Sequence, residues 1–374
     1  MIASLAVIVA QMRDAGGFQT ILTNPLAQFG PKERPLLGPT LLPDLNVPFE
    51  TEYTETGVKY RTVVANDGSR YSPAQKKGNS IVGSVHIRLA NQDIASEFTS
   101  ADYDAAIRMA QYNLPQAARA NPDMIGVITV TDWYKAAILN SLMQKREKMR
   151  WEAMLDAVVK VRGDGDYEED VQLSNPTGHR VTAALAWDNN THDPFDDIDA
   201  MAEFLEDKDL SVNRFITSRV LARKLFNNAK VKARVGGFVA VDGATGALLN
   251  SAMSINLKKL NAYMEDQSRP VIELYDEKYG LQTGKEYYFR RNAFMVACTT
   301  GRNREIDLGD DEPLILQNTL GYHAVGRPAG AEAPGIKEFS EYKGNKPPHF
   351  NAEAWQTTFP GMLEPEAIGV INQP

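Results

Sequence analysis

Residues 186–200 have the sequence AWDNNTHDPFDDIDA, which contains the clearest helix start in the chain. The carboxylate of Asp193 can accept hydrogen bonds from the free N–H groups at the start of a helix. Pro194 fits the first helical position, where its missing N–H costs no hydrogen bond. The acidic side chains of Asp196 and Asp197 favour the positive end of the helix dipole. We therefore predict a helix capped by Asp193 and Pro194.

The same stretch also has the side-chain types of a metal site. The candidate ligands are His192, Asp193, Asp196, Asp197, Asp199 and Glu203. Because the helix start already accounts for three of them, we favour capping. A metal-dependent enzyme that uses the acidic cluster near Asp193 remains the alternative from a different functional class, and metal-dependent turnover would support it.

Upstream of this stretch, residues 132–161 form a run of thirty residues without Gly or Pro. We predict a single helix about 45 Å long, at 1.5 Å per residue. Thr131 or Asp132 can cap its start, and Gly163 can end it. A helix of this length suggests a strut.

The middle of this predicted helix is basic. Its charged residues are Lys145, Arg146, Lys148 and Arg150. We interpret them as a solvated face, with contact to phosphate or to an acidic partner as the alternative.

The first 92 residues suggest two segments with little core of their own. Residues 1–48 carry six prolines after a short apolar start, so we expect an extended arm. Residues 49–92 contain two β-rich stretches with the turn sequence Asn66-Asp67-Gly68-Ser69 between them, which predicts a long β hairpin. Such a hairpin is marginally stable alone and needs a neighbouring element or another subunit to pack on.

The remainder of the chain predicts an α+β fold. Short strands and helices mix over residues 164–300 without a repeating βαβ unit. Residues 301–350 are rich in Gly, Pro and charge, and we expect them to be irregular. Residues 359–363 and 367–372 are expected to be closing strands.

Composition excludes several functional classes. The 374-residue chain has a net charge of −8, so it would repel nucleic acid and anionic membranes as a whole. Its single cysteine, Cys298, lies in an apolar run and is expected to be buried and inert. The apolar start at residues 1–10 is too short for a membrane span, so we expect a soluble protein made inside the cell.

We find no sequence signature of catalysis or cofactor binding. No G-x-S-x-G motif, P-loop or dinucleotide fingerprint is present, and the five histidines form no close pair. We therefore predict no enzyme activity and no cofactor.

Three stretches resemble a known family in their residues and in their order. The first is the W-(polar)-D-P-x-x-D-I pattern between Trp187 and Ile198; the others are residues 271–296 and 360–371. Together with the arm, hairpin and long helix, they resemble the lambda-type major capsid protein E family of tailed phages, which has the Hong Kong 97-type fold. The resemblance covers about residues 45–374.

This resemblance implies a domain organisation. Residues 1–48 would form the N-terminal arm, and 49–92 the extended hairpin called the E-loop. Residues 93–165 would form the peripheral domain with its spine helix, and 166–350 the axial domain. Residues 351–374 would return as C-terminal strands to the core of both.

The resemblance also implies function and partners. Subunits would assemble as hexamers and pentamers into an icosahedral procapsid in the host cytoplasm, and the virion would then hold packaged double-stranded DNA with only weak, non-specific contact. A separate scaffolding protein, a portal and a decoration protein are the implied partners, and no membrane is involved. A nanocompartment shell of the same fold is the alternative.

Within the E-loop, the resemblance implies contacts to a neighbouring subunit. The residues assigned to these contacts are Asn66, Asp67, Gly68, Arg70, Tyr71, Lys76 and Lys77. Some relatives crosslink a lysine to an asparagine, for which Lys76 and Lys77 are available, but the lambda type does not need this bond.

Overall fold

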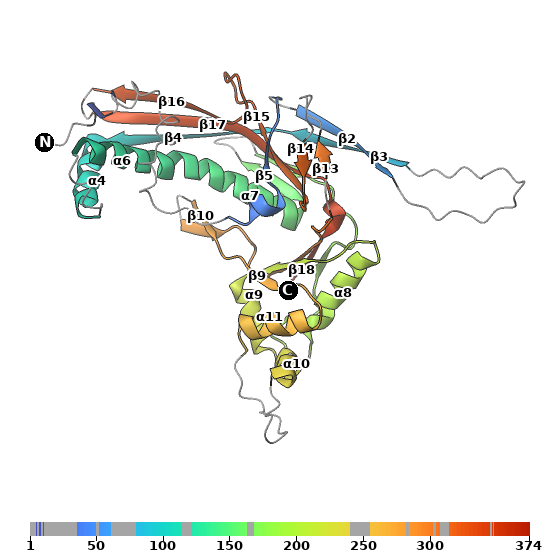
Figure 1. The fold of residues 1–374 in the computed structure, drawn as a ribbon. Helices are drawn as coiled ribbons and strands as arrows, with labels where there is room; N and C mark the ends of the chain where they lie inside the picture. Colours follow the sequence, from blue (N-terminus) through green and yellow to red (C-terminus); the bar gives the residue numbers. More distant parts are fainter. Residues whose placement is uncertain are drawn as a thin grey trace, which may run out of the picture.

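The structure is a computed structural model of the 374-residue chain. It describes residues 5, 7, 8, 10, 36–49, 52–60, 80–113, 122–162, 168–239, 255–281, 284–301, 304–306, 314–344, 346 and 348–374. Figure 1 shows two parts, an elongated unit and a compact unit that lies below it.

The elongated unit is built on a five-stranded sheet with β17 at its centre. Strand β4 pairs with one edge of β17, while β16 and β15 pair with successive parts of the other edge. Strand β1 adds to β15 in parallel. The strands are β1 (Asp44–Asn46), β4 (Ala90–Thr99), β15 (Gly321–Gly326), β16 (Ile336–Lys343) and β17 (His349–Met362).

A long helical run covers one face of this sheet (Figure 1). It consists of α6 (Pro122–Tyr134), a π-helical turn (Lys135–Leu139) and α7 (Asn140–Asp156), and α4 (Ser100–Asn113) packs beside it. The helix predicted over residues 132–161 is therefore wrong at both ends. It starts at Pro122, which suits a first turn, and it ends where Ala157 adopts a left-handed conformation with φ 52°.

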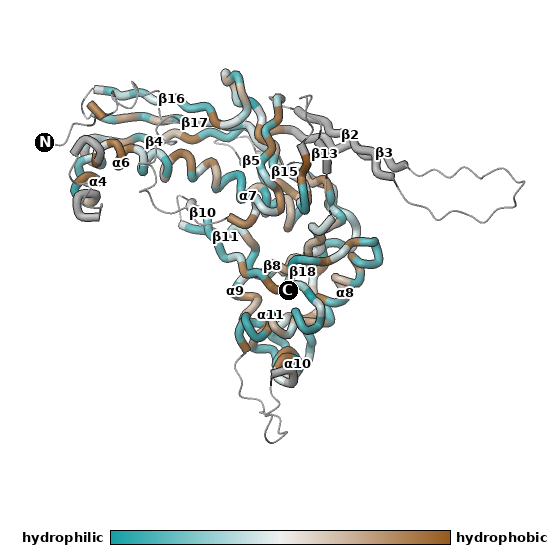
Figure 2. The backbone as a smooth tube through the Cα atoms, in the orientation of Figure 1, coloured by the Kyte–Doolittle hydropathy of each residue, from teal (hydrophilic) through white to brown (hydrophobic). Residues whose placement is uncertain are grey.

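The compact unit has a second five-stranded sheet, in the order β7-β18-β12-β8-β9. Its central strand β12 is buried along its whole length. The strands are β7 (Arg180–Thr182), β8 (Arg214–Thr217), β9 (Ile272–Leu274), β12 (Ala293–Ala297) and β18 (Ile368–Asn372). Its helices are α8 (Pro194–Glu206), α9 (Arg219–Asn227), α10 (Ala229–Val239) and α11 (Leu257–Asp266). Figure 2 shows hydrophilic and hydrophobic stretches alternating along these helices, as expected when one face is buried.

Four two-stranded hairpins extend from the two sheets. They are β2 (Glu52–Tyr60) with β3 (Ser80–Arg88), β5 (Val158–Arg162) with β6 (Glu168–Gln172), β10 (Lys278–Leu281) with β11 (Gly284–Tyr287), and β13 (Arg304–Ile306) with β14 (Leu314–Leu316). Two short helices, α3 (Gly38–Leu41) and a 3-10 turn (Pro365–Ala367), complete the described elements.

One continuous hydrophobic core joins the two units. It includes Trp151 of α7 and, in the compact unit, Trp187, Phe195 and Phe294, all fully buried. Cys298 belongs to this core and is buried, as predicted. A second cluster fills the space between the start of the helical run and the large sheet.

Two expectations about irregular segments are wrong. Residues 301–350 were expected to lack regular structure, yet β15 is completely buried and pairs with β17. Residues 36–47 of the expected arm are built into their own subunit, where Leu41, Leu42 and Leu45 are buried. In both segments, prolines and glycines break up strands that long-range pairing then stabilises.

Candidate assembly surfaces

The hairpin formed by β2 and β3 reaches away from the large sheet (Figure 1). Its two strands pair in antiparallel register from Glu52 with Arg88 to Tyr60 with Ser80. Within the described residues, the hairpin forms a two-stranded sheet of its own rather than an extension of the large one. Its backbone edges are therefore available for another chain, because an unpaired strand edge is a template for further pairing.

The family resemblance implies seven contact residues in this hairpin: Asn66, Asp67, Gly68, Arg70, Tyr71, Lys76 and Lys77. They all lie outside the described residues. Their role as intersubunit contacts stays a prediction.

The face of the large sheet opposite the helices carries charged and aromatic side chains. Along β17, Ala352 and Ala354 are fully buried toward the helical run, whereas the intervening Glu353 is exposed. On the neighbouring strand β16, Phe339 pairs with Glu353 and is 53% exposed. The outer face of the sheet therefore carries a carboxylate next to an exposed aromatic ring.

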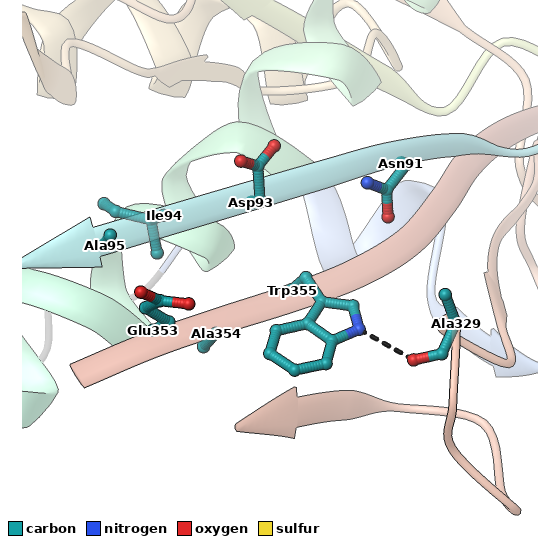
Figure 3. Close-up of a pocket in the computed structure, with 8 residues that line it drawn as sticks. All are labelled: Asn91, Asp93, Ile94, Ala95, Ala329, Glu353, Ala354 and Trp355. Atoms are coloured by element: carbon teal, nitrogen blue, oxygen red, sulfur yellow. Dashed lines mark hydrogen bonds between the residues drawn. The ribbon is translucent and has the colours of Figure 1, made fainter. Parts of the chain in front are cut away.

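An open depression of about 390 Å³ lies on this face (Figure 3). It is lined by Asn91, Asp93, Ile94, Ala95, Ala329, Glu353, Ala354 and Trp355. The indole of Trp355 is directed toward Ala329, and its Nε1–H donates to the Ala329 carbonyl at 3.0 Å. The depression therefore combines a fixed aromatic ring with the carboxylates of Asp93 and Glu353, which suits a basic or amide-bearing segment.

Inside the molecule, a buried carboxylate joins three distant segments. Glu147 on α7 is completely buried and accepts hydrogen bonds from the Gly38 backbone N–H at 3.0 Å, Trp151 Nε1 at 2.7 Å and the Tyr275 hydroxyl at 2.7 Å. The guanidinium of Arg150 lies 3.4 Å from its other oxygen. A Cβ at Gly38 would overlap this carboxylate, so the position requires glycine. Burial and the nearby Glu147 charge raise the pKa of Tyr275, which keeps its hydroxyl a donor.

Two arginines of the basic helix segment are buried beside Glu147. Arg146 and Arg150 both form ion pairs with Asp44 of β1, and Arg146 Nε also donates to Gln356 of β17 at 2.7 Å. The interpretation of this segment as a solvated face is therefore wrong for these two residues. Their acidic partner belongs to the same chain and lies about a hundred residues away in sequence.

The acidic stretch near Asp193 forms a helix cap. Asp193 Oδ1 accepts a hydrogen bond from the backbone N–H of Phe195 at 3.1 Å, and Pro194 occupies the first turn. The second carboxylate oxygen of Asp193 pairs with Arg234 of α10 at 2.8 Å.

Four of the other five candidate metal ligands also have protein partners, including Asp196, which pairs with Arg234 at 3.0 Å. Asp197 accepts from Trp187 Nε1 at 2.7 Å and lies 2.8 Å from His192 Nε2, while Asp199 pairs with Arg269 at 2.6 Å. The described residues contain no group of three or more His, Cys, Asp or Glu side chains that could hold a metal ion. None of the described helices has the length and apolar character needed to cross a membrane.

Sequence reasoning missed the buried network around Glu147. The signal was present in part, because the segment around Arg146 and Arg150 concentrates charge on a helix that also carries Met149, Trp151 and Met154. A face that mixes arginines with large apolar residues indicates buried ion pairs. The sequence did not identify Asp44 and Tyr275 as the partners.

Comparisons with known proteins show which proteins this architecture is similar to. The profile of the family described as phage major capsid protein E matches residues 134–301. A prophage protein of E. coli CFT073 assigned as a capsid protein is 11% identical, with a TM-score of 0.56 over 100% of both chains. A phage-related protein from Bordetella bronchiseptica RB50 is 12% identical, with a TM-score of 0.49 over 93% of this chain and 94% of that one. The capsid of Myoviridae phage XM1 is 11% identical, with a TM-score of 0.45 over 95% and 97%. A comparison with curated protein sequences gives no match.

Proposed function

We propose that this chain assembles with copies of itself into the shell of a phage head. Its residues 134–301 match the phage major capsid protein E family. The Hong Kong 97-type α+β fold predicted from the sequence is confirmed by the likeness to the prophage protein, which extends over the whole chain. The protein is therefore a structural shell protein of a phage virion. The proposal depends on the family match over residues 134–301. The similarity of fold to the prophage protein then extends over the whole chain.

The hairpin of β2 and β3 supports the next step of the proposal. We assign residues 49–92 to the E-loop and expect this hairpin to lie over a neighbouring subunit. The hairpin forms a two-stranded sheet of its own. Because an isolated hairpin is only marginally stable, most of its stability must come from the element or subunit that it packs against. The carboxylates of Asp93 and Glu353 beside Trp355 suit the basic residues assigned to this loop, Arg70, Lys76 and Lys77.

We assign the two units to the proposed domains with two changes. In this proposal the compact unit is the axial domain, and the elongated unit is the peripheral domain with its spine helix. Strands β15 and β16 belong to the sheet of the elongated unit, so we assign residues 321–343 to the peripheral domain rather than to an axial domain of 166–350. Residues 36–47 belong to the same domain, and only the earlier residues remain assigned to the arm.

The proposed partners follow from a shell that encloses DNA. Copies of the chain would form hexamers and pentamers during assembly in the host cytoplasm. A scaffolding protein, a portal and a decoration protein would be further partners. The net charge of −8 suits a wall that confines DNA without binding it tightly.

Electron microscopy and light scattering of the purified full chain, with and without a co-expressed scaffolding protein, test this function. We expect closed particles of uniform size. A compact monomer that persists at high protein concentration under both conditions would contradict the proposal.

A further inference from the structure

We propose that the acidic end of helix α8 in one subunit contacts the basic face of helices α9 and α10 in a second copy of this chain. The contact would repeat around a ring of compact units. This inference rests on the proposed assembly into a shell and specifies one of its contacts.

The charges of the compact unit are strongly separated along the sequence. Residues 188–209 contain nine acidic residues and one basic residue, Lys208. Residues 210–264 contain nine basic residues and one acidic residue, Asp242. The net charge of the whole chain does not show this separation, because the two segments have opposite charge and largely cancel.

The two charged segments pack together at the start of α8, but their unpaired charges lie apart. Lys224 of α9 pairs with Asp188 at 3.3 Å, and the Ala229 N–H at the start of α10 donates to Asn190 at 2.9 Å. The unpaired acidic residues lie at the opposite end of α8. In a ring of identical subunits, one side of each subunit meets a different side of the next. Separated patches of opposite charge therefore suit this arrangement.

Some of these charges are already paired within the subunit, and these pairs lie at the start of α8. Arg234 of α10 pairs with Asp193 and Asp196, and Arg269 pairs with Asp199. The opposite end of α8 is about 20 Å away, at 1.5 Å per residue. A lysine or arginine side chain of α10 cannot span that distance within one chain.

The acidic end of α8 has no cationic partner among the described residues. It comprises the exposed residues Glu203, Glu206, Asp207 and Asp209. They stand at the C-terminal end of the helix, where the dipole disfavours negative charge. A cation from outside the subunit would relieve this unfavourable placement.

The basic face shows the reverse placement. Lys230 and Lys232 are exposed in the first turn of α10, where the dipole disfavours positive charge, and this turn has no acidic residue. Arg223 is exposed on the preceding helix α9. The described residues contain no ion-pair partner for these three side chains. The C-terminal end of α8 and the first turn of α10 thus carry charges that destabilise the isolated subunit. A second copy of the chain would neutralise them.

Charge reversal tests the contact with the full chain. One variant carries Glu206→Lys and Asp207→Lys, a second carries Lys230→Glu and Lys232→Glu, and a third carries all four changes. The matched controls keep the charges: Glu206→Asp with Asp207→Glu, and Lys230→Arg with Lys232→Arg. Electron microscopy and light scattering measure closed particles, and the melting temperature of the unassembled chain measures folding.

We expect each two-residue reversal to lose closed particles without a lower melting temperature, because every new charge stands at the end of its helix that the dipole favours. The fourfold variant should regain particles, since the two faces have exchanged charge, and both controls should assemble. Higher salt should weaken assembly, because exposed charge pairs are screened.

Four outcomes would overturn the inference. Reversed chains that assemble as well as the unaltered one would exclude the contact, while the proposed shell function would stand. A folded fourfold variant that still fails would show that the two faces do not meet. Normal assembly of the Lys230→Glu, Lys232→Glu variant with weaker binding of double-stranded DNA would assign the basic face to nucleic acid instead. If the unaltered chain forms no particles, the proposed function fails as well.

Discussion

The hydroxyl of Tyr275 donates a hydrogen bond to Glu147 at 2.7 Å, and this bond ties the compact unit to helix α7 of the elongated unit. The ring of Tyr275 also stacks on Trp151, with centroids 4.9 Å apart. The same carboxylate receives the Gly38 backbone N–H. One buried side chain therefore sets the relative position of the spine helix, the compact unit and the segment before β1.

Loss of this carboxylate should destabilise the subunit strongly. We expect Glu147→Ala to lower the free energy of unfolding by about 3–5 kcal/mol, because it leaves the buried donors of Gly38, Trp151 and Tyr275 without an acceptor and removes one of the two carboxylates that pair with Arg150. Tyr275→Phe removes a single hydrogen bond to a charged group and should cost about 1.5–3 kcal/mol. Urea unfolding of the unassembled chain measures both values.

Tyr288→Phe provides the matched control for Tyr275→Phe. Tyr288 is also a buried tyrosine and lies beside Tyr275, but its hydroxyl has no hydrogen bond to another described residue. Its removal deletes no hydrogen bond between described residues, so Tyr288→Phe should cost clearly less than Tyr275→Phe. Equal costs for the two tyrosines would show that the bond to Glu147 does not tie the units together.

Asp193 should act through two separate contacts. Asp193→Ala removes the cap and the ion pair with Arg234, and the cap alone is worth about 1 kcal/mol. Asp193→Asn keeps an oxygen for the Phe195 N–H and loses only the ion pair, worth about 0–1 kcal/mol because Arg234 is partly exposed. Thermal unfolding with and without a chelator separates the hypotheses. A drop in melting temperature on chelation, with Asn as damaging as Ala, would support the metal site instead.

Stability should fall in mild acid because of His323. This side chain is completely buried, and neither ring nitrogen has a hydrogen-bond partner among the described residues. Burial, with help from Arg150 and Arg146, lowers its pKa well below 6.5. The unfolded chain therefore takes up a proton first as the pH falls below about 6.5, and each further pH unit costs up to about 1.4 kcal/mol until the folded pKa is reached.

The His323→Leu variant tests the source of this pH dependence. Above pH 7 the unaltered histidine is neutral in both the folded and the unfolded chain, so the difference in stability between the two proteins should not vary with pH there. Between pH 6.5 and 5 the unaltered chain should lose stability more steeply than the variant in urea titrations. Parallel curves over this range would show that other groups cause the loss.

Local signals predicted the compact unit better than the large sheet. Helix α8 begins at Pro194 with Asp193 as its cap, as predicted from the sequence. The start of the helical run at Pro122 was missed because it contains Gly126 and lacks a clear polar face. Gly126 fits there because a side chain would meet Tyr103 and Ile8.

The large sheet depends on pairing between distant residues, which the sequence does not encode locally. Strand β15 pairs with both β1 and β17, so its stability comes from segments hundreds of residues apart. The network of Asp44 with Arg146 and Arg150 has the same origin. The family resemblance supplied the order of the domains, but it did not supply these contacts.

The hairpin of β2 and β3 should be needed for assembly but not for folding. Because Tyr60 pairs with Ser80, replacing residues 61–79 with Asn-Gly would join the strands by a two-residue turn without changing their register. We expect the shortened chain to remain folded by circular dichroism, with a melting temperature close to that of the unaltered chain, and to form no closed particles. The reason is that a shell repeats the same hairpin contact at every subunit, so that its removal weakens the whole particle.

The same turn replacement in another hairpin controls for the new two-residue turn. Arg162 pairs with Glu168 in the hairpin of β5 and β6, so replacing residues 163–167 with Asn-Gly uses the same design. That control should assemble normally. If the shortened β2–β3 variant unfolds, the hairpin contributes to the core of its own subunit, and if it assembles as well as the control, it does not contact a neighbour and its assignment as the E-loop is wrong.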